Sequence, residues 1–273
     1  MIYRIDELSE NPINPITHRV YDSTWIILML TDSQDYQKMC GSRNGCAYTI
    51  KISTAKCEEW KMAVCDCMGF CTANHQNLIL VMTEADLSAA KSHYIGHSYN
   101  EPFLREGEPS VLVHSTPASC WEQIKREGTL KSWNLLKAEK TITEEHPIGT
   151  QLGDPADFSG YIMFGGGVTG EIIVSSKQHG KIVMDVNAEY TTGARLYFDA
   201  ERMARDGLLI RDGCHLKVKD TLPLTPYLIW AAAWDTVGLA GPVSVPRIFA
   251  ERSDKQFQAV LRQYRQRADG QNI

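Results

Sequence analysis

The sequence lacks any apolar run long enough to cross a membrane. Its two most apolar stretches, 24–30 (TWIILML) and 227–234 (YLIWAAAW), are far shorter than the roughly 20 residues that a spanning helix needs. The N-terminus, MIYRIDELSE, contains acidic residues and no apolar core of the kind that a signal peptide has. We therefore expect a cytoplasmic protein that does not associate with membranes.

The chain also lacks an excess of basic residues. It has 28 Lys and Arg against 33 Asp and Glu, a net charge of −5 at pH 7, which argues against a generally basic coat for nucleic acid. Binding depends on local patches rather than on totals, so a basic groove is not excluded. The hydrophobic share of 43% is that of an ordinary folded protein.

The eight cysteines lack the Cys-x-x-Cys pairs that aim two thiolates at one zinc ion. Those of the N-terminal half cluster with other spacings: Cys40, Cys46, Cys57, Cys65, Cys67 and Cys71, with His75 nearby. Reduced, partly buried thiols are therefore expected, and no metal. A zinc half-site at Cys67 and Cys71, four positions apart, is the alternative.

The hydrophobic patterns predict an α+β protein in three parts. These are an N-terminal α/β lobe of unknown role (1–92), a second domain (93–250) and a C-terminal helix (251–273). Strands are expected at 25–30, 47–52, 78–82, 111–113, 161–164, 181–186, 208–211 and 215–218. Helices are expected at 53–67, 84–92, 119–128, 199–205 and 254–267. The glycines 165–167 do not form a Gly-x-Gly-x-x-Gly fingerprint, and no long helix is expected after them, which disfavours a doubly wound sheet.

Several segments of the second part follow one another in a distinctive order. They are 95–98 (IGHS), 112–116 (LVHST), 120–128 (CWEQIKREG), 161–164 (YIMF), 177–181 (KQHGK) and 199–203 (DAERM), followed by two Asp-Gly pairs. This series resembles the motifs of the RNA 2′-phosphotransferases (KptA type), which belong to the NAD-binding ADP-ribosyltransferase superfamily. The resemblance covers about half of the chain and implies an ADP-ribosyltransferase-like split β-sheet.

The same resemblance implies where NAD binds. The cofactor-binding residues would be Ser98, His114, Ser115, Thr116 and Tyr161. A strand that ends beside the start of a helix offers a ring nitrogen, hydroxyls and backbone N–H groups, which suit ribose hydroxyls and a pyrophosphate. His114 would orient the ribose, and Tyr161 would stack on the nicotinamide. The alternatives are structural: His114 closes its strand, and Tyr161 packs in the core.

The catalytic residues implied by the resemblance are His97, Gln178 and His179. In the family an RNA 2′-phosphate attacks NAD and nicotinamide leaves, so arginines must hold a phosphate dianion. At the matching positions this chain has Ser92 and Gln178, and a glutamine cannot neutralise a phosphate. Arg195 and Arg211 are therefore proposed as replacements. His97, His114 and Tyr161 are expected to converge around a nicotinamide riboside.

Three functions follow as hypotheses. The first is an NAD-dependent transferase acting on an RNA phosphate or a related acceptor. The second is a non-catalytic module that binds NAD, ADP-ribose or RNA on a degenerate scaffold. The third is a zinc-bearing interaction protein. The basic residues Arg262, Arg265 and Arg267 form either a solvated helix face or a contact with RNA phosphate.

Overall fold

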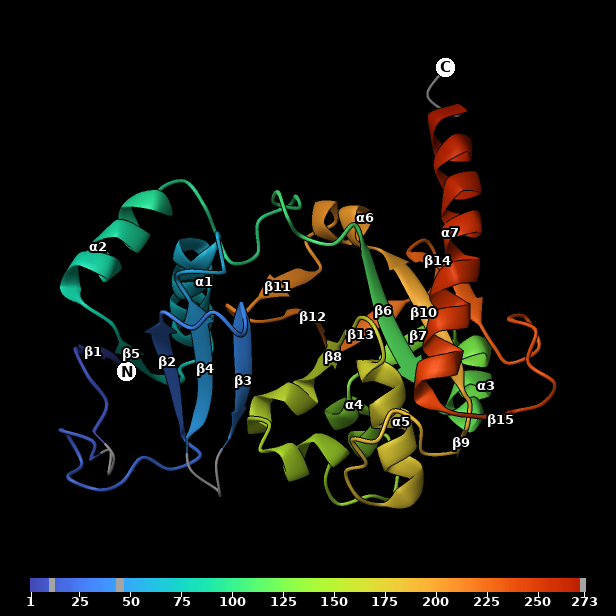
Figure 1. Cartoon of the computed structure of the whole chain (residues 1–273), viewed down its shortest axis with the longest axis horizontal. Helices are drawn as coiled ribbons and strands as arrows, with labels where there is room; N and C mark the ends of the chain where they lie inside the picture. Colours follow the sequence, from blue (N-terminus) through green and yellow to red (C-terminus); the bar gives the residue numbers. More distant parts are fainter. Residues whose placement is uncertain (10–12, 43–46, 271–273) are drawn as a thin grey trace. The chain divides into compact units, whose positions relative to one another are not determined.

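The computed structural model describes residues 1–9, 13–42 and 47–270 (Figure 1). Within these residues the chain is a mixed α/β protein with seven α-helices and several sheets. It divides into two units. Unit 1 contains residues 1–101, 152–158 and 209–217; unit 2 contains 102–151, 159–208 and the chain from residue 218 onward. No helix in the described ranges has the length and apolarity to span a membrane.

Unit 1 is built on a five-stranded sheet of order β1-β5-β2-β4-β3. The strands are β1 (Ile2–Ile5), β2 (Trp25–Thr31), β3 (Lys38–Ser42), β4 (Tyr48–Ser53) and β5 (Asn77–Val81). The first four in this order run parallel, and the edge strand β3 is antiparallel to β4. Parallel strands tend to be continuous apolar runs because both of their faces are covered. This property made β2 and β5 predictable, whereas the alternating β4 (YTIKIS) was predicted from its β-branched residues.

Two helices follow the sheet strands of unit 1: α1 (Trp60–Ala73) and α2 (Glu84–His93). The helix predicted at 53–67 is wrong in its start, because Ser53 belongs to β4 and its hydroxyl accepts the N–H groups of Ala55 and Lys56 to form a turn. The prediction of α2 is confirmed. Its N-terminus is fixed by a capping box between Thr83 and Asp86.

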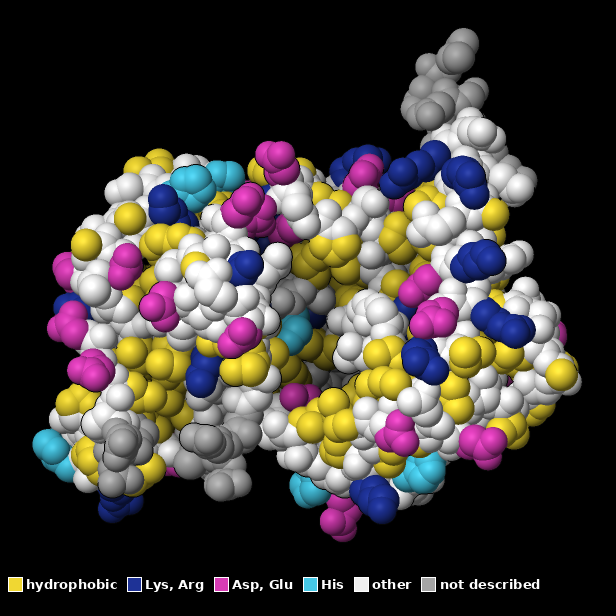
Figure 2. All heavy atoms as spheres, in the orientation of Figure 1, with side chains coloured by type: hydrophobic (Ala, Val, Ile, Leu, Met, Phe, Trp, Pro, Cys, Tyr) yellow, Lys and Arg dark blue, Asp and Glu magenta, His cyan; other side chains and the backbone are white. Residues whose placement is uncertain are grey.

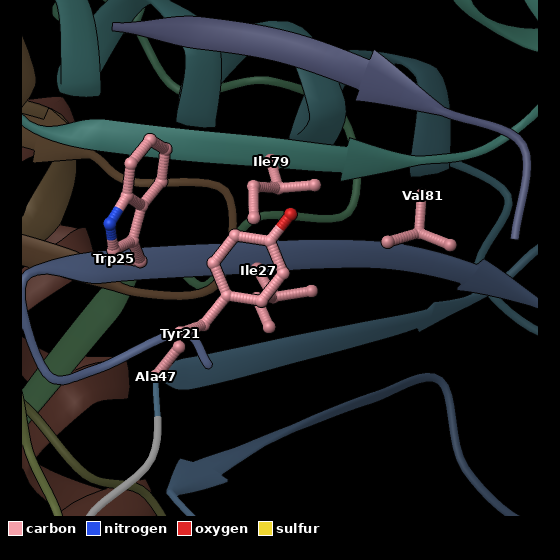
Figure 3. Close-up of a cluster of buried hydrophobic side chains, with 6 residues drawn as sticks. All are labelled: Tyr21, Trp25, Ile27, Ala47, Ile79 and Val81. Carbon is pink, nitrogen blue, oxygen red and sulfur yellow. The ribbon is translucent and has the colours of Figure 1, made fainter. Parts of the chain in front are cut away.

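One core cluster of unit 1 joins aromatic and aliphatic side chains (Figure 3). Its buried members are Tyr21, Trp25, Ile27, Ala47, Ile79 and Val81. Ile27 and Ile79 are direct partners on β2 and β5, so their side chains lie next to each other on one face. Each such buried side chain contributes about 1.5–3 kcal/mol to folding.

Unit 2 contains an antiparallel sheet of order β14-β10-β6. Its strands are β6 (Val111–Thr116), β10 (Ala194–Asp199) and β14 (Leu228–Ala232). Arg195 pairs with Ser115, and Leu196 pairs with His114. The central strand β10 was not predicted, because the charged Arg195 interrupts its apolar pattern. The structure nevertheless buries it from Ala194 to Phe198.

Five helices belong to unit 2: α3 (Ala118–Glu127), α4 (Trp133–Ala138), α5 (Thr169–His179), α6 (Ala200–Arg205) and α7 (Pro246–Gly270). Its short strands are β7 (Thr129–Lys131), β8 (Tyr161–Met163), β9 (Tyr190–Thr191), β13 (Thr221–Pro223) and β15 (Val243–Ser244). The remaining strands are β11 (Leu209–Arg211), in unit 1, and β12 (Leu216–Lys219), whose first two residues are assigned to unit 1 and whose last two are assigned to unit 2. Helix α3 ends at Gly128, as predicted, and this glycine has a φ of 69°.

Helix α5 corrects two predictions. A helix of 11 residues does follow the glycine run, and residues 181–186 form no strand. The β-branched residues Ile172 and Ile173 are typical of strands, and α5 buries so much of its surface that no polar stripe marks it as a helix. After α5 the backbone N–H of Val183 donates to Ser176, and Met184 is 64% exposed.

The predicted helix at 254–267 lies within α7, and its apolar side packs on unit 2 as expected. The ring of Phe257 stacks on Tyr197 with centroids 4.0 Å apart, and Val260 and Leu261 pack against the same cluster. The hydroxyl of Tyr264 donates to the carboxylate of Asp199. The side chain of Arg267 lies outside the described residues.

Candidate functional site

His114 lies near the carboxyl end of β6. Its Nδ1 is 3.0 Å from the carbonyl oxygen of Met163. Because a carbonyl oxygen only accepts, Nδ1 carries the hydrogen and Nε2 carries the lone pair. Burial lowers the pKa of His114 to about 4, although the hydrogen bond to Met163 acts in the opposite direction. At neutral pH His114 is therefore an uncharged ring whose Nε2 accepts hydrogen bonds.

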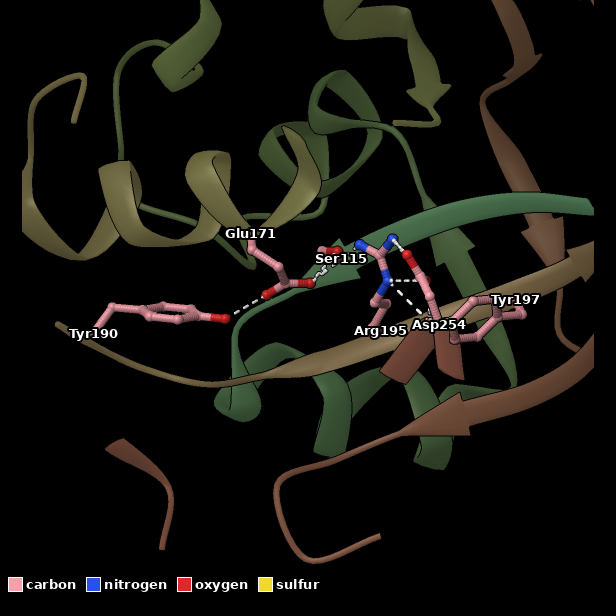
Figure 4. A network of polar contacts seen from close by, with 6 residues as sticks. All are labelled: Ser115, Glu171, Tyr190, Arg195, Tyr197 and Asp254. Carbon is pink, nitrogen blue, oxygen red and sulfur yellow. Dashed lines mark hydrogen bonds and ion pairs between the residues drawn. The ribbon is translucent and has the colours of Figure 1, made fainter. Parts of the chain in front are cut away.

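Ser115, expected at the cofactor, donates its hydroxyl hydrogen to Oε1 of Glu171 at 2.6 Å (Figure 4). Tyr190 donates to the other oxygen of Glu171, also at 2.6 Å. The close approach of α5 to β6 requires Gly170, because a Cβ there would lie 2.5 Å from the Ser115 hydroxyl. The hydroxyl of Ser115 is thus engaged by Glu171 within unit 2.

Glu171 was not singled out by the sequence analysis. It is fully buried, and burial raises its pKa, although the hydrogen bonds from Ser115 and Tyr190 and the charge of Arg195 lower it. The only signal in the sequence is a single carboxylate at the start of the apolar stretch 171–174. Such an isolated acid is not distinctive.

Arg195, expected to bind a phosphate, is fully buried on β10. Its Nε and Nη2 donate to the carboxylate of Asp254 at 3.0–3.2 Å, and Nε also donates to the hydroxyl of Tyr197 (Figure 4). Its Nη1 lies 3.6 Å from Oε1 of Glu171. The guanidinium therefore links α5, β10 and α7 from inside unit 2.

Gln178 and His179 lie at the exposed C-terminal end of α5. The amide of Gln178 pairs with the backbone of Thr191: Nε2 donates to its carbonyl at 2.6 Å, and Oε1 accepts its N–H at 2.9 Å. His179 Nδ1 lies 2.8 Å from the carbonyl of Ser175. Gln178 thus joins α5 to β9, whereas His179 contacts a carbonyl of its own helix.

Thr116 and Tyr161, two further expected cofactor contacts, are almost fully buried. The carbonyl of Thr116 faces Gly193, where a Cβ would lie only 1.8 Å from it. Tyr161 is 8% exposed on β8. This exposure favours core packing over a face for nicotinamide.

The other three expected site residues belong to unit 1. His97 Nδ1 lies 3.1 Å from the carboxylate of the buried Glu101, and Ser98 donates to Asn100. Arg211 is buried on β11, with Nη1 donating to the carbonyl of Glu101 at 3.4 Å. The structure therefore brings His97 and Arg211 to the same glutamate. The predicted convergence of His97 with His114 and Tyr161 concerns residues of different units and stays a prediction.

The cysteines of α1 are buried thiols, as expected. Contact with Cys71 and burial raise the pKa of Cys67. Among the described residues, no third metal-binding side chain joins this pair; Cys46 lies outside them. This arrangement favours packing over a zinc half-site.

Unit 2 thus contains a neutral imidazole, His114, near the end of β6 and a buried ionic network that includes the next residue of the strand, Ser115. An imidazole of this kind can accept a hydrogen bond from a hydroxyl, such as that of a ribose. The cation nearest to Ser115 in this network, Arg195, is already engaged by Asp254. The chain matches none of the family models, curated proteins or solved structures with which it was compared.

Proposed function

We propose that unit 2 is an ADP-ribosyltransferase-like domain that binds NAD beside His114 and transfers ADP-ribose with release of nicotinamide. The acceptor is an RNA phosphate or a related nucleophile. Two arguments support this. Segments that resemble the motifs of the RNA 2′-phosphotransferases follow one another in unit 2 from residue 112 to residue 207. The observation that carries the proposal is the contact of His114 Nδ1 with the carbonyl oxygen of Met163 at 3.0 Å, which leaves Nε2 as a hydrogen-bond acceptor.

In this mechanism His114 Nε2 accepts a hydrogen bond from a hydroxyl of the nicotinamide ribose and fixes the sugar. The acceptor oxygen then attacks C1′ of that ribose. The C1′–N bond breaks, and nicotinamide leaves with the bonding electrons as a neutral molecule. Positive charge develops on the sugar during this step. An uncharged imidazole does not oppose that charge, whereas an imidazolium would.

A second function, binding of NAD, ADP-ribose or RNA without turnover, is favoured by two other observations. Arg195 is held by Asp254, and the Gln178 amide by Thr191, so neither supplies the charged, bidentate contact that a phosphate dianion requires. An RNA partner is supported by basic side chains along α7 (Figure 2). The exposed ones are Arg247, Arg252, Lys255, Arg262 and Arg265.

The two functions are separated by measuring nicotinamide released from NAD, with 2′-phosphorylated RNA and with the same RNA unphosphorylated. We expect release by the wild type, loss of release in His114→Ala, and unchanged release in the control His146→Ala, whose side chain is exposed in unit 2. A thermal shift with NAD but no nicotinamide indicates the binding module. Absence of both a shift and release contradicts both proposals.

A further inference from the structure

Three potential metal ligands meet in unit 1, and none of them is among the site residues considered above. The Sγ atoms of Cys40 and Cys214 and a ring nitrogen of His215 all lie within 4.8 Å of one another. Cys40 is on the edge strand β3, and the other two residues follow β11. Cys40 and His215 are 175 positions apart in the chain, so no spacing in the sequence shows that they are neighbours.

The imidazole of His215 is oriented by Asp212. Oδ2 of Asp212 is 3.3 Å from Nδ1 of His215, which leaves Nε2 facing Cys40 Sγ at 3.6 Å. Oδ1 of Asp212 accepts the backbone N–H groups of Cys214 and His215, at 2.9 and 2.7 Å. Lys217 donates to Oδ2 at 2.7 Å. A carboxylate that holds the far nitrogen of a histidine is the usual support of a metal-binding imidazole.

The turn that presents Cys214 and His215 is itself fixed against α1. Gly213 has a φ of 91°, and a Cβ at this position would lie 2.6 Å from the carbonyl oxygen of Ala63 and 2.9 Å from Cβ of Cys67. Glycine alone fits such an approach. On the other side, Cys40 is fixed by its pairing with Ile50 on β4. The ligand atoms therefore come from a preorganised frame.

We propose that Cys40, Cys214 and His215 bind one zinc ion. Two thiolates and one imidazole nitrogen are a preferred donor set for Zn²⁺. Zn–S and Zn–N bonds of about 2.3 and 2.0–2.1 Å in tetrahedral geometry place the sulfur and nitrogen about 3.5 Å apart. The distance from Cys40 Sγ to His215 Nε2 is 3.6 Å. Three protein ligands leave the fourth position to water. Binding releases the ligand protons, because both thiols and Nε2 must be deprotonated.

The same atoms could serve two other chemistries, and the experiment has to separate them. Cys40, His215 and Asp212 follow the order of nucleophile, base and orienting acid. Cys40 and Cys214 could also join in a disulfide under oxidising conditions. Zinc is favoured because it alone would use all three groups, which lie close together. A cysteine nucleophile needs only one thiol, and a disulfide needs no histidine.

The test uses the full chain, reduced, stripped with a chelator and then titrated with Zn²⁺ against a chromogenic chelator. We expect one equivalent to bind. Cys40→Ser, Cys214→Ser and His215→Ala should each weaken binding, and Asp212→Asn should weaken it about 10–100-fold. The matched control is Cys120→Ser, which removes an exposed thiol of unit 2 and should leave zinc binding unchanged. Circular dichroism of each variant checks that it is folded.

Two further measurements do not depend on folded variants. Co²⁺ added to the stripped wild type should give the thiolate charge-transfer band and the intense visible bands of a tetrahedral site. Zinc should also protect Cys40 from alkylation. The proposal is overturned if the reduced wild type takes up no zinc. It is equally overturned if the double variant Cys40→Ser, Cys214→Ser is folded and keeps the zinc affinity of the wild type. Alkylation of Cys40 at the same rate with zinc as without it would also overturn the proposal. This test is independent of NAD binding by unit 2.

Discussion

Glu171 and Arg195 lie 3.6 Å apart, Oε1 to Nη1, and both side chains are buried in unit 2. Each has further partners: Ser115 and Tyr190 for the carboxylate, Asp254 for the guanidinium. Removing two charges from water is costly, and only close pairing offsets that cost. Arg195 is therefore best understood as a structural cation of the β10 strand.

Arg195→Ala should lower the free energy of unfolding by about 3–5 kcal/mol, because it leaves Glu171 buried without its cation. Urea denaturation followed by circular dichroism measures this change. The control Arg262→Ala removes an exposed arginine and should stay within about 0.5 kcal/mol of the wild type. A double-mutant cycle with Glu171→Gln should show coupling. If Arg195→Ala lowers the free energy of unfolding by less than about 1 kcal/mol, the structural role of Arg195 is contradicted and a catalytic role is again possible.

Gly193→Ala should be strongly destabilising. The added Cβ would lie 1.8 Å from the carbonyl oxygen of Thr116, so β6 and β10 must separate where they pair. We expect a loss of about 3 kcal/mol or more, measured as a lower midpoint in urea. Gly166→Ala is the matched control, since no atom lies within 4 Å of its Cβ. Equal stability of the two variants would contradict this account of the strand contact.

The stability of the protein should depend on pH through His114. Its pKa is about 4 when folded, below the usual value of about 6.5 in an unfolded chain. Between these values the unfolded chain binds more protons, so stability falls as the pH drops through 6.5 and levels off below about 4. The full effect is on the order of 3 kcal/mol.

The variant His114→Gln lacks the titrating ring and should lose this part of the pH dependence. The difference between wild type and variant, measured by urea denaturation from pH 4 to 8, isolates the contribution of His114. NMR titration of the ring gives the folded pKa directly. A value near 6.5 would show that the imidazole is hydrated and would remove the argument for a neutral ring.

Lys217→Ala should destabilise unit 1 by about 3–5 kcal/mol. The Lys217 side chain is fully buried, 2.7 Å from Asp212 and 3.8 Å from the ring centroid of Phe70. Burial acts to raise the pKa of Asp212, but Lys217 and His215 hold it well below its usual value. The variant would therefore leave a charged carboxylate buried without the lysine that pairs with it. The control is Lys219→Ala, an exposed lysine two positions on. Similar unfolding midpoints for the two variants would contradict the ion pair.

Local signals in the sequence were sufficient for much of the fold. The apolar runs predicted β2 and β5, and β-branched residues predicted β4. Acidic residues in the first turn predicted α2, and Gly128 predicted the end of α3. The sequence failed where burial in the fold overrides local pattern. Helix α5 is buried on too many sides to show a stripe, and β10 has a charged residue at its second position.

The site residues were harder to predict, because their partners are distant in the chain. The sequence marks Ser115 and Arg195 as polar residues in a motif region, but it does not show that each meets Glu171 inside the fold. The sequence likewise does not show that Cys40 and Cys214 are neighbours in the fold. Whether a polar side chain faces a ligand or another side chain is decided by the tertiary structure, not by its own neighbours in sequence.

The discontinuity of unit 1 has a consequence for how the protein is made. The ribosome completes α1 and β5 long before it adds residues 209–217, and domains tend to fold as units in the order of their synthesis. Until that late segment arrives, the surface of α1 around Ala63 and Cys67, against which Gly213 will pack, stays uncovered on the nascent chain. A fragment that stops at residue 101 would keep this surface open permanently, so unit 1 cannot be transplanted as a simple N-terminal module.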